Sequence, residues 1–507
     1  MRKILFILFG IAIVSAGIAF FIPGPTSIIL FLFSFTLALF GVFDVIQKKH
    51  SLLRSNPLIA RLRWVFEAER DKIKQYFIES DLDGTPINRE RRSIVYQRSK
   101  EQTETVPFGT QHDLYAKGYE FMQHSMFPIA YDKVKGDRVV FGSEKCSQPY
   151  DASIINISAM SFGSLSKNAI KALNLGAKEG GFAHNTGEGG ISPYHLEGGD
   201  LIFQVGTGYF GSGKTGENGK RFFDEAVYTA NATRPEVKMI ELKLSQGAKP
   251  GHGGILPAKK NTEEIAKIRA VQPGTRVNSP PSHSAFSDFE GMIAFIQKLR
   301  ELSGGKPVGI KLCIGNNDEI RTMIQTFATQ KNYPDFIAVD GGEGGTGSAP
   351  LEFSNYMGMP LLEGLSLIKS ELQKHKLKEN IRIIASGKAV NGFDIIKLLA
   401  LGADTVSMAR SFMLSLGCIQ ARECNLDSCP VGIATQNPDL VRALVVAKKY
   451  NRVKNFHAKT IEAVKEMIGV MGVDSIDKVK PDHIFRRMKD DKIASLKNVY
   501  SKEIELV

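Results

Sequence analysis

From Asp151 onward, short apolar runs alternate with helical stretches, and each run ends in a loop rich in glycine, serine or lysine. This alternation is typical of α/β proteins with parallel strands. Its length of about 270 residues favours an eight-stranded (β/α)8 TIM barrel, with the active site at the carboxyl ends of the strands. A doubly wound open sheet stays possible, because periodicity does not show closure. The clearest predicted strands are 154–157, 239–242, 308–312, 336–339, 381–384 and 405–408, with helices at 288–302 and 393–399.

Two long apolar runs, Ile4 to Ile22 and Ile28 to Ile46, flank a turn-like segment at residues 23–27. Each run is long enough to approach the thickness of a bilayer, which predicts a transmembrane helical hairpin over residues 1–50. Basic residues at both ends favour a cytoplasmic catalytic domain at the inner or cell membrane. The alternative is a cleaved signal peptide, because small residues occur near Ser15. The polar stretch 51–149 is interpreted as a juxtamembrane linker and cap, with an amphipathic segment at 58–77.

The composition limits the class of partner. The net charge is +12, but the lysines and arginines are scattered and no basic block occurs. An anionic lipid surface explains this charge more simply than nucleic acid does, so no nucleic-acid partner is expected. Five cysteines, an odd number in a long chain, argue against a disulfide framework and for a reducing compartment.

Three of the five cysteines, Cys418, Cys424 and Cys429, lie within twelve residues. Cysteine thiolates hold iron–sulfur clusters, and a trio indicates a three-iron cluster or a four-ligand cluster whose fourth ligand lies elsewhere. Buried structural cysteines and a zinc site are the alternatives.

Two glycine-rich loops follow late predicted strands, at Asp340 to Gly347 and at Ser386 to Gly392. Such loops bind phosphate through backbone N–H groups, so FMN is the leading cofactor hypothesis, although the glycines could serve turn geometry alone. Lys311 ends a buried strand, where a cation could stabilise a reduced flavin or simply reach water. Lys243 presents the same choice, in a loop reaching Gly254 that suits a dicarboxylate.

The residues from about 150 to 470 resemble the FMN-binding synthase domain of glutamate synthase. The hairpin also matches the layout of short, membrane-anchored members of that family. The motifs that carry the resemblance are Ser158 to Ser166, Asn185 to Gly190, Lys243 to Gly254, Ser279 to His283, Gly344 to Gly347 and Cys418 to Gln436. The resemblance places the barrel at 150–436 and a C-terminal helical extension at 437–507.

The resemblance implies an oxidoreductase of the class that acts on CH–NH2 donors. In this family ammonia and 2-oxoglutarate give 2-iminoglutarate, which hydride from reduced FMN converts to L-glutamate, with electrons arriving through a [3Fe-4S] cluster. The implied catalytic residues are Lys311, Lys243, Gln246 and Glu188, with Lys243 and Gln246 on 2-oxoglutarate. The implied FMN-binding residues are Ser158, Ala159, Met160, Ser161, Gln204, Lys311, Gly344, Gly345, Thr346 and Gly387. The implied cluster ligands are Cys418, Cys424 and Cys429.

The chain also departs from the family pattern. A hairpin and linker stand where glutamate synthases carry a glutaminase domain, so ammonia is expected from solution or from a separate glutaminase subunit. Tyr209 stands where the pattern has arginine, and His252 and Glu343 are further departures. No dinucleotide fingerprint is found, which predicts a separate electron donor, either a ferredoxin or a partner reductase. The alternatives are a membrane-tethered FMN and iron–sulfur electron-transfer subunit without amination activity, or an FMN oxidoreductase acting on a related amino or oxo acid.

Overall fold

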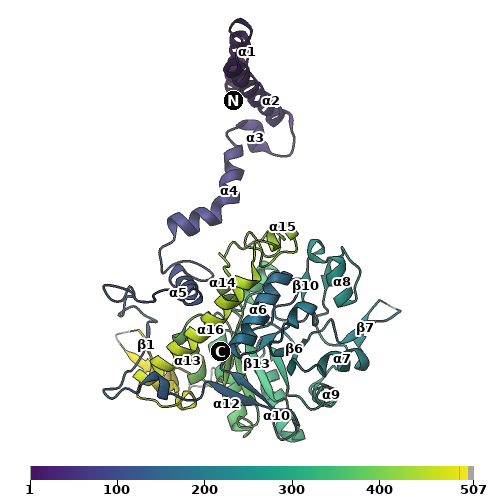
Figure 1. Cartoon of the computed structure of the whole chain (residues 1–507), viewed down its shortest axis with the longest axis vertical. Coiled ribbons are helices and arrows are strands. Elements are labelled where there is room, and N and C mark those ends of the chain that lie inside the picture. The colour runs from purple at the N-terminus through teal and green to yellow at the C-terminus, as the bar shows by residue number, and fades with distance from the viewer. Residues whose placement is uncertain (1, 218, 490–491, 501–507) are drawn as a thin grey trace. The chain divides into compact units, whose positions relative to one another are not determined.

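The computed structural model describes residues 2–217, 219–489 and 492–500 (Figure 1). The chain forms two compact units, residues 1–85 and 86–507. Within the predicted C-terminal extension, residues 490–491 and 501–507 lie outside the described part. The four-part domain division predicted from the sequence stays a prediction.

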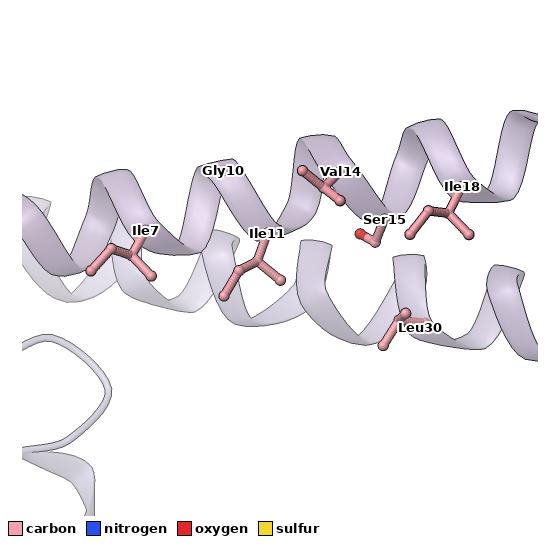
Figure 2. Close-up of a pocket in the computed structure, with 7 residues that line it drawn as sticks. All are labelled: Ile7, Gly10, Ile11, Val14, Ser15, Ile18 and Leu30. Atoms are coloured by element: carbon pink, nitrogen blue, oxygen red, sulfur yellow. The ribbon is translucent and has the colours of Figure 1, made fainter.

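The first unit is helical. Its elements are α1 (Arg2–Phe21), α2 (Pro25–Ile46), α3 (Ser51–Ser55), α4 (Arg61–Ile73) and the π-helical turn η1 (Lys74–Ile78). Helices α1 and α2 pack against each other, and the Ser15 and Ser34 hydroxyls hydrogen-bond across them at 2.6 Å. Figure 2 shows the residues that line an apolar pocket along this pair, with Leu30 on α2 and the others on α1. The pocket is lined by Ile7, Gly10, Ile11, Val14, Ser15, Ile18 and Leu30.

Among the described residues, α2 is the one helix long and apolar enough to cross a membrane. The described side chains of α1 give a shorter apolar helix, Phe9–Phe21, because those of residues 1–6 and 8 are outside the description. A hairpin that crosses twice therefore stays a prediction. At the end of α2, the fully buried Asp44 carboxylate binds Arg61 at 2.5 Å and accepts a hydrogen bond from the Leu58 N–H at 3.0 Å, which fixes where α4 begins.

The second unit is built on a closed barrel of parallel strands, which confirms the predicted (β/α)8 fold and excludes the open sheet. Figure 1 shows the strands enclosed by helices. In order around the barrel the strands are β4 (Ile155–Ile157), β5 (His184–Asn185), β6 (Leu201–Val205), β9 (Val237–Lys243), β12 (Val308–Leu312), β13 (Phe336–Asp340), β14 (Arg382–Ser386) and β15 (Thr405–Met408).

The helices of this unit cover the barrel and its ends. They are α5 (Arg89–Ser99), α6 (Lys167–Gly180), α7 (Glu225–Ala232), α8 (Glu263–Arg269), α9 (Phe289–Leu302), α10 (Asn317–Gln330), α11 (Leu351–Tyr356), α12 (Leu361–Lys374), α13 (Gly392–Ala400), α14 (Arg410–Leu416), α15 (Pro438–Val441), α16 (Val446–Val470) and α17 (Leu496–Tyr500). The long helix α16 packs against α5, α6, α13 and α14. It holds the segments on either side of the barrel together.

Short elements complete the unit. A three-stranded sheet contains β1 (Glu120–Met122), β16 (Ile484–Arg487) and β17 (Ile493–Ser495), and three hairpin-like pairs join β2 (Arg138–Phe141) with β3 (Tyr150–Ser153), β7 (Gly213–Thr215) with β8 (Arg221–Phe223), and β10 (Ile255–Leu256) with β11 (Val277–Asn278). The 3-10 turns are η2 (Tyr131–Lys133), η3 (Pro193–His195), η4 (Ala258–Lys260), η5 (Ile476–Lys478) and η6 (Pro481–His483).

The interior of the barrel changes from apolar to charged along the strands. Phe336 and Met239 belong to a buried apolar cluster near the strand starts, which Phe141 and Tyr150 of β2 and β3 also join. Because side chains in a strand alternate between faces, Phe336, Ala338 and Asp340 share the inner face, as do Met239, Glu241 and Lys243. The charged members of both series lie at the carboxyl ends of the strands. The fold therefore collects charge at the end of the barrel where active sites form.

Buried histidines should make the protein sensitive to acid. Burial lowers the pKa of both His195 and His457 to about 3, so both stay neutral in the folded protein, whereas the unfolded chain binds protons below about pH 6.5. Their contribution to stability is therefore complete above pH 6.5 and is lost as the pH falls. The expected loss approaches about 1.4 kcal/mol per pH unit per histidine.

Urea unfolding measured between pH 7 and pH 4.5 checks this prediction. His457→Gln keeps a polar group near the Ser153 hydroxyl, which bonds the His457 Nε2 at 2.9 Å. It should reduce the slope of unfolding free energy against pH, whereas the exposed-site control His124→Gln should leave the slope unchanged. Equal slopes in all three proteins would contradict a neutral buried His457.

Candidate functional site

Two lysines lie side by side at the carboxyl ends of neighbouring strands. Lys243 of β9 and Lys311 of β12 are register partners, so both side chains point into the barrel. Lys311 is 6% exposed and its Nζ lies 3.4 Å from the Asp340 Oδ2. Burial disfavours the Lys311 ammonium, but the Asp340 and Glu241 carboxylates outweigh that effect and raise its pKa. Lys311 is therefore a fixed positive charge.

Lys243 has two partners, which connects three of the predicted catalytic residues. Its Nζ lies 3.0 Å from the Glu188 Oε1 and donates to the Gln246 Oε1 at 3.0 Å. Burial alone would raise the pKa of Glu188, but the Lys243 charge and hydrogen bond lower it. Glu188 is thus an anion in direct contact with a cation. A small cleft opens onto this pair, lined by Glu188, Thr207, Lys243, Leu244, Ser245, Gly251, His252, Gly253, Gly254, Pro280 and Pro281.

Asp340 and Glu241 tie the lysines to the other strands. The Asp340 Oδ2 also accepts a hydrogen bond from the Gly247 N–H at 3.0 Å, which holds the loop after β9 against β13. The Glu241 Oε1 accepts from Asn185 at 2.9 Å and from Gln204 at 2.6 Å. Gln204, predicted to contact FMN, therefore holds Glu241 inside the barrel in this structure.

The predicted flavin-lining loop, Ser158 to Ser161, directly follows β4 and is largely buried. A cation that the sequence reasoning missed lies against it. Arg269 of α8 is 4% exposed, and its Nη2 donates to the Ser161 Oγ at 3.2 Å and to the Phe162 carbonyl at 3.0 Å. Its Nε has no partner among the described atoms, and burial lowers its pKa to about 10. No strand pattern points to Arg269, because it comes from a surface helix.

The two glycine-rich loops follow β13 and β14, as predicted, and a second missed cation lies beside them. Gly344, Gly345 and Thr346 follow β13, Gly387 follows β14, and Arg410 begins α14 just after β15. The Arg410 Nη2 donates to the Glu343 carbonyl at 2.8 Å, and a Cβ at Gly345 would lie 3.0 Å from the Arg410 Nε. Backbone N–H groups beside a guanidinium form the kind of cradle that binds phosphate. The sequence signal that could have identified Arg410 was its position, two residues after the last predicted strand.

Lys249 is a further buried cation, and it lies in the loop that begins at Lys243. Its Nζ donates to the Ser348 carbonyl at 2.7 Å, and burial lowers its pKa to about 8. This bond joins the loop after β9 to the loop after β13. The sequence reasoning took the lysines of this loop together as suited to a dicarboxylate, and it gave Lys249 no separate role.

Tyr209, the departure from the family pattern, is fully buried and does not line the cleft. Its hydroxyl accepts from the Ala285 N–H at 3.2 Å, so its own proton is free for the His283 Nδ1 at 3.1 Å. The His283 Nε2 then donates to the Lys243 carbonyl at 2.9 Å. This chain of hydrogen bonds holds the backbone of Lys243 in place. Burial lowers the pKa of His283 to about 4, which keeps the ring neutral as the chain requires.

The three predicted cluster ligands, Cys418, Cys424 and Cys429, are free thiols on the loop after α14. The Cys418 Sγ accepts a hydrogen bond from the Gln420 N–H at 3.4 Å. Burial raises the pKa of Cys418 to about 12, and the charges of Cys424 and Cys429 act in the same direction. The three thiol groups are therefore close enough to interact electrostatically. Across the described chain, no group of three or more His, Cys, Asp or Glu side chains is arranged to hold a metal ion. The cluster therefore stays a prediction.

A buried cation beside these thiols tests whether an anionic cluster fits. Lys260 is 2% exposed, its Nζ donates to the Ser164 carbonyl at 2.9 Å, and the described residues place no carboxylate within 4 Å of it. Burial lowers the Lys260 pKa, and the charges that oppose this come from Asp427, Cys424 and Cys429. A buried ammonium requires a compensating anion. Thiolates bound to iron would supply one, so the donor set and its surroundings fit the cluster.

Comparison with known proteins gives the family. A profile described as a conserved region in glutamate synthase matches residues 99–474. The chain belongs to the glutamate synthase family. This family member is 34% identical to the glutamate synthase large subunit-like protein YerD of Bacillus subtilis, over 90% of this chain and 93% of that protein.

Two further matches cover less of the matched protein or have lower sequence identity. The chain is 34% identical to an archaeal glutamate synthase [NADPH] of Methanocaldococcus jannaschii, over 71% of this chain, and it spans 66% of that protein's length. The flavin-binding domain of baker's yeast flavocytochrome b2 matches 82% of this chain and 83% of that domain, at 14% identity and a TM-score of 0.44.

The Tyr209 chain of hydrogen bonds yields a stability prediction. Tyr209→Phe removes the proton donated to His283 and leaves a buried ring nitrogen unpaired, so the free energy of unfolding should fall by about 1–3 kcal/mol. Urea unfolding measures the loss. The matched control is Tyr356→Phe at a side chain that is 83% exposed, which should change the free energy little. A Tyr209→Phe protein as stable as the control would contradict the assigned hydrogen bonds.

Proposed function

We propose that this chain is a glutamate synthase-type oxidoreductase that binds FMN and a [3Fe-4S] cluster and aminates 2-oxoglutarate reductively to L-glutamate. The observation that carries the proposal is the paired Lys243 and Lys311 beside Glu188 and Asp340 at the mouth of the barrel, on a chain of this family. Ammonia comes from solution or from a separate glutaminase subunit. Electrons come from a separate donor, a ferredoxin or a reductase.

Family membership and the loops after the last strands support FMN. Gly344, Gly345, Thr346 and Gly387 would hold the phosphate together with Arg410, whose guanidinium lies against the first of these loops. Ser158, Ala159, Met160 and Ser161 would line the ring, and Lys311 would contact it. When bound, FMN supplies hydride and the cluster single electrons, which amino-acid side chains cannot supply.

Protein groups would bind and orient the substrate. Lys243 lines the cleft and contacts the Gln246 side chain, so an ammonium and a neighbouring amide would bind one carboxylate of 2-oxoglutarate by charge-assisted hydrogen bonds. The substrate carboxylate would compete with Glu188 for Lys243, and Glu188 could then accept a proton nearby. Lys311 stays charged throughout, because Asp340 and Glu241 hold its pKa up. A fixed cation there favours negative charge developing on a neighbouring ring.

We also propose that helix α2 anchors the protein in the inner or cell membrane, with α1 as a second span and the barrel in the cytoplasm. The length and apolar composition of α2 support the anchor. The buried Asp44 and its partly exposed partner Arg61 would then lie at the end of the span, where a charge pair can reach the headgroup region.

The amination can be tested on the full chain in detergent, reconstituted with FMN and reduced anaerobically. Addition of 2-oxoglutarate and ammonium should reoxidise the flavin and form one glutamate per flavin. Lys243→Met should lower kcat/KM for 2-oxoglutarate about 10- to 100-fold, as expected for a charged hydrogen bond. Lys331→Met, at an exposed lysine, is the control. Flavin oxidation without glutamate would instead favour an electron-transfer subunit or a different oxo acid.

The cluster assignment is tested separately by measuring the iron content and the paramagnetic signal of the protein. Cys424→Ser should abolish the paramagnetic signal of a three-iron cluster and reduction by an external donor, while most FMN stays bound. Cys146→Ser is the matched control, because that thiol bonds the Asp335 carboxylate at 3.2 Å and lies outside the loop. Equal iron content in both variants would contradict the proposed set of cluster ligands.

A further inference from the structure

Three cations that have no carboxylate partner among the described residues lie close to the backbone of Gly417 and Cys418. A Cβ added at Gly417 would lie 2.9 Å from the Lys449 Nζ and 4.0 Å from the Arg452 Nη1. Lys100 joins them, because its Nζ lies 6.0 Å from the Tyr96 ring centroid and the Tyr96 hydroxyl donates to the Cys418 carbonyl at 2.6 Å. In the described part of the chain, none of these three cations has a carboxylate within 4 Å.

The same surface carries exposed apolar side chains. Val445, Lys449 and Arg452 follow helical spacing at the start of α16 and therefore share a face, and Val445 is 54% exposed. Ile419, the residue after Cys418, is 36% exposed. We name this surface the Cys418 basic face, made of Lys100, Ile419, Val445, Lys449 and Arg452.

Nearby acids do not neutralise the face. The Glu101 charge contributes to raising the pKa of Lys459, and the Glu423 carboxylate accepts a hydrogen bond from the Ser428 hydroxyl at 2.8 Å. Asp439 pairs with Arg442 at 3.4 Å. Burial lowers the pKa of Lys449, and the charges of Arg452 and Lys100 lower it further, so the three cations repel one another. Such self-repulsion is relieved when a surface of opposite charge covers the group.

We propose that the Cys418 basic face docks a small acidic electron-carrier protein. A surface that carries both exposed apolar groups and cations is suited to a weak, electrostatically steered encounter, which is typical of redox partners. The position over Gly417 matters, because the absence of a side chain at this residue lets the Lys449 ammonium approach the backbone next to Cys418. The proposal rests on the proposed function, which makes Cys418 a cluster ligand, and it adds the site and the charge of the partner.

The test uses the full chain in nanodiscs of zwitterionic phosphatidylcholine and an acidic two-iron ferredoxin as the probe. Binding should weaken steeply between about 20 mM and about 200 mM salt. The variant Lys100→Glu with Lys449→Glu and Arg452→Glu should raise the Kd about tenfold or more. The control replaces three exposed lysines elsewhere, Lys267, Lys331 and Lys376, with glutamate, and should change the Kd less than about twofold.

Cys424→Ser separates this inference from the proposed function. If this variant still binds ferredoxin but holds no cluster, the result supports the docking face independently of the cluster chemistry. The proposal is overturned if the face variant binds ferredoxin as tightly as the control. It is also overturned if the wild type prefers vesicles containing anionic phosphatidylglycerol over ferredoxin and the face variant loses that preference, because the face would then bind lipid.

Discussion

Two ammonium groups, Lys243 and Lys311, are buried beside each other in the barrel, and the site depends on their neutralisation. Like charges on adjacent strands repel, so the fold must bring anions to the same place. Glu188 arrives on the loop after β5, Glu241 lies on the inner face of β9, and Asp340 ends β13. The charges that could bind a substrate are therefore also those that fix the strand-end loops.

Hydrogen bonds hold the carboxylates at the functional end of the barrel in place. Asn185 and Gln204 satisfy Glu241, and the Gly247 N–H satisfies Asp340, so the carboxylates have little freedom to move away from the lysines. The opposite end needs no such arrangement, because Phe336 and Met239 fill it with apolar volume. A preformed electrostatic site costs less reorganisation when charge develops in a reaction.

The features that could be predicted from the sequence are those that depend on short-range patterns of residues. Strands β12 and β15 begin and end at the predicted residues, and Lys243 and Lys311 were found because parallel strands end at one edge. Strand β5 was missed because it has two residues, His184 and Asn185, too few for a periodic signal. The barrel was predicted from the length of the alternation and not from its periodicity, because closure depends on β4 pairing with β15 across a large sequence separation.

Residues that act from outside the strands were harder to predict. Arg269 reaches Ser161 from a helix, and Tyr209 turns away from the cleft toward His283, so a departure from the family pattern concerns backbone support more than substrate contact. His252, in contrast, does line the cleft. Its Nδ1 lies 2.9 Å from the Gly253 carbonyl, which can only accept, so the Nδ1 donates this hydrogen bond.

Buried lysines in two places follow the same electrostatic rule with different anions. Lys311 has Asp340 and Glu241 as counter-charges, all supplied by the barrel. Lys260 is equally buried, yet its nearest anionic candidates are Asp427 and the thiols of Cys424 and Cys429. A thiol compensates a cation only as a thiolate, and burial opposes that form unless a metal binds it. Asp427 supplies the first counter-charge to Lys260, and the thiols of Cys424 and Cys429 would add to it only in their thiolate form.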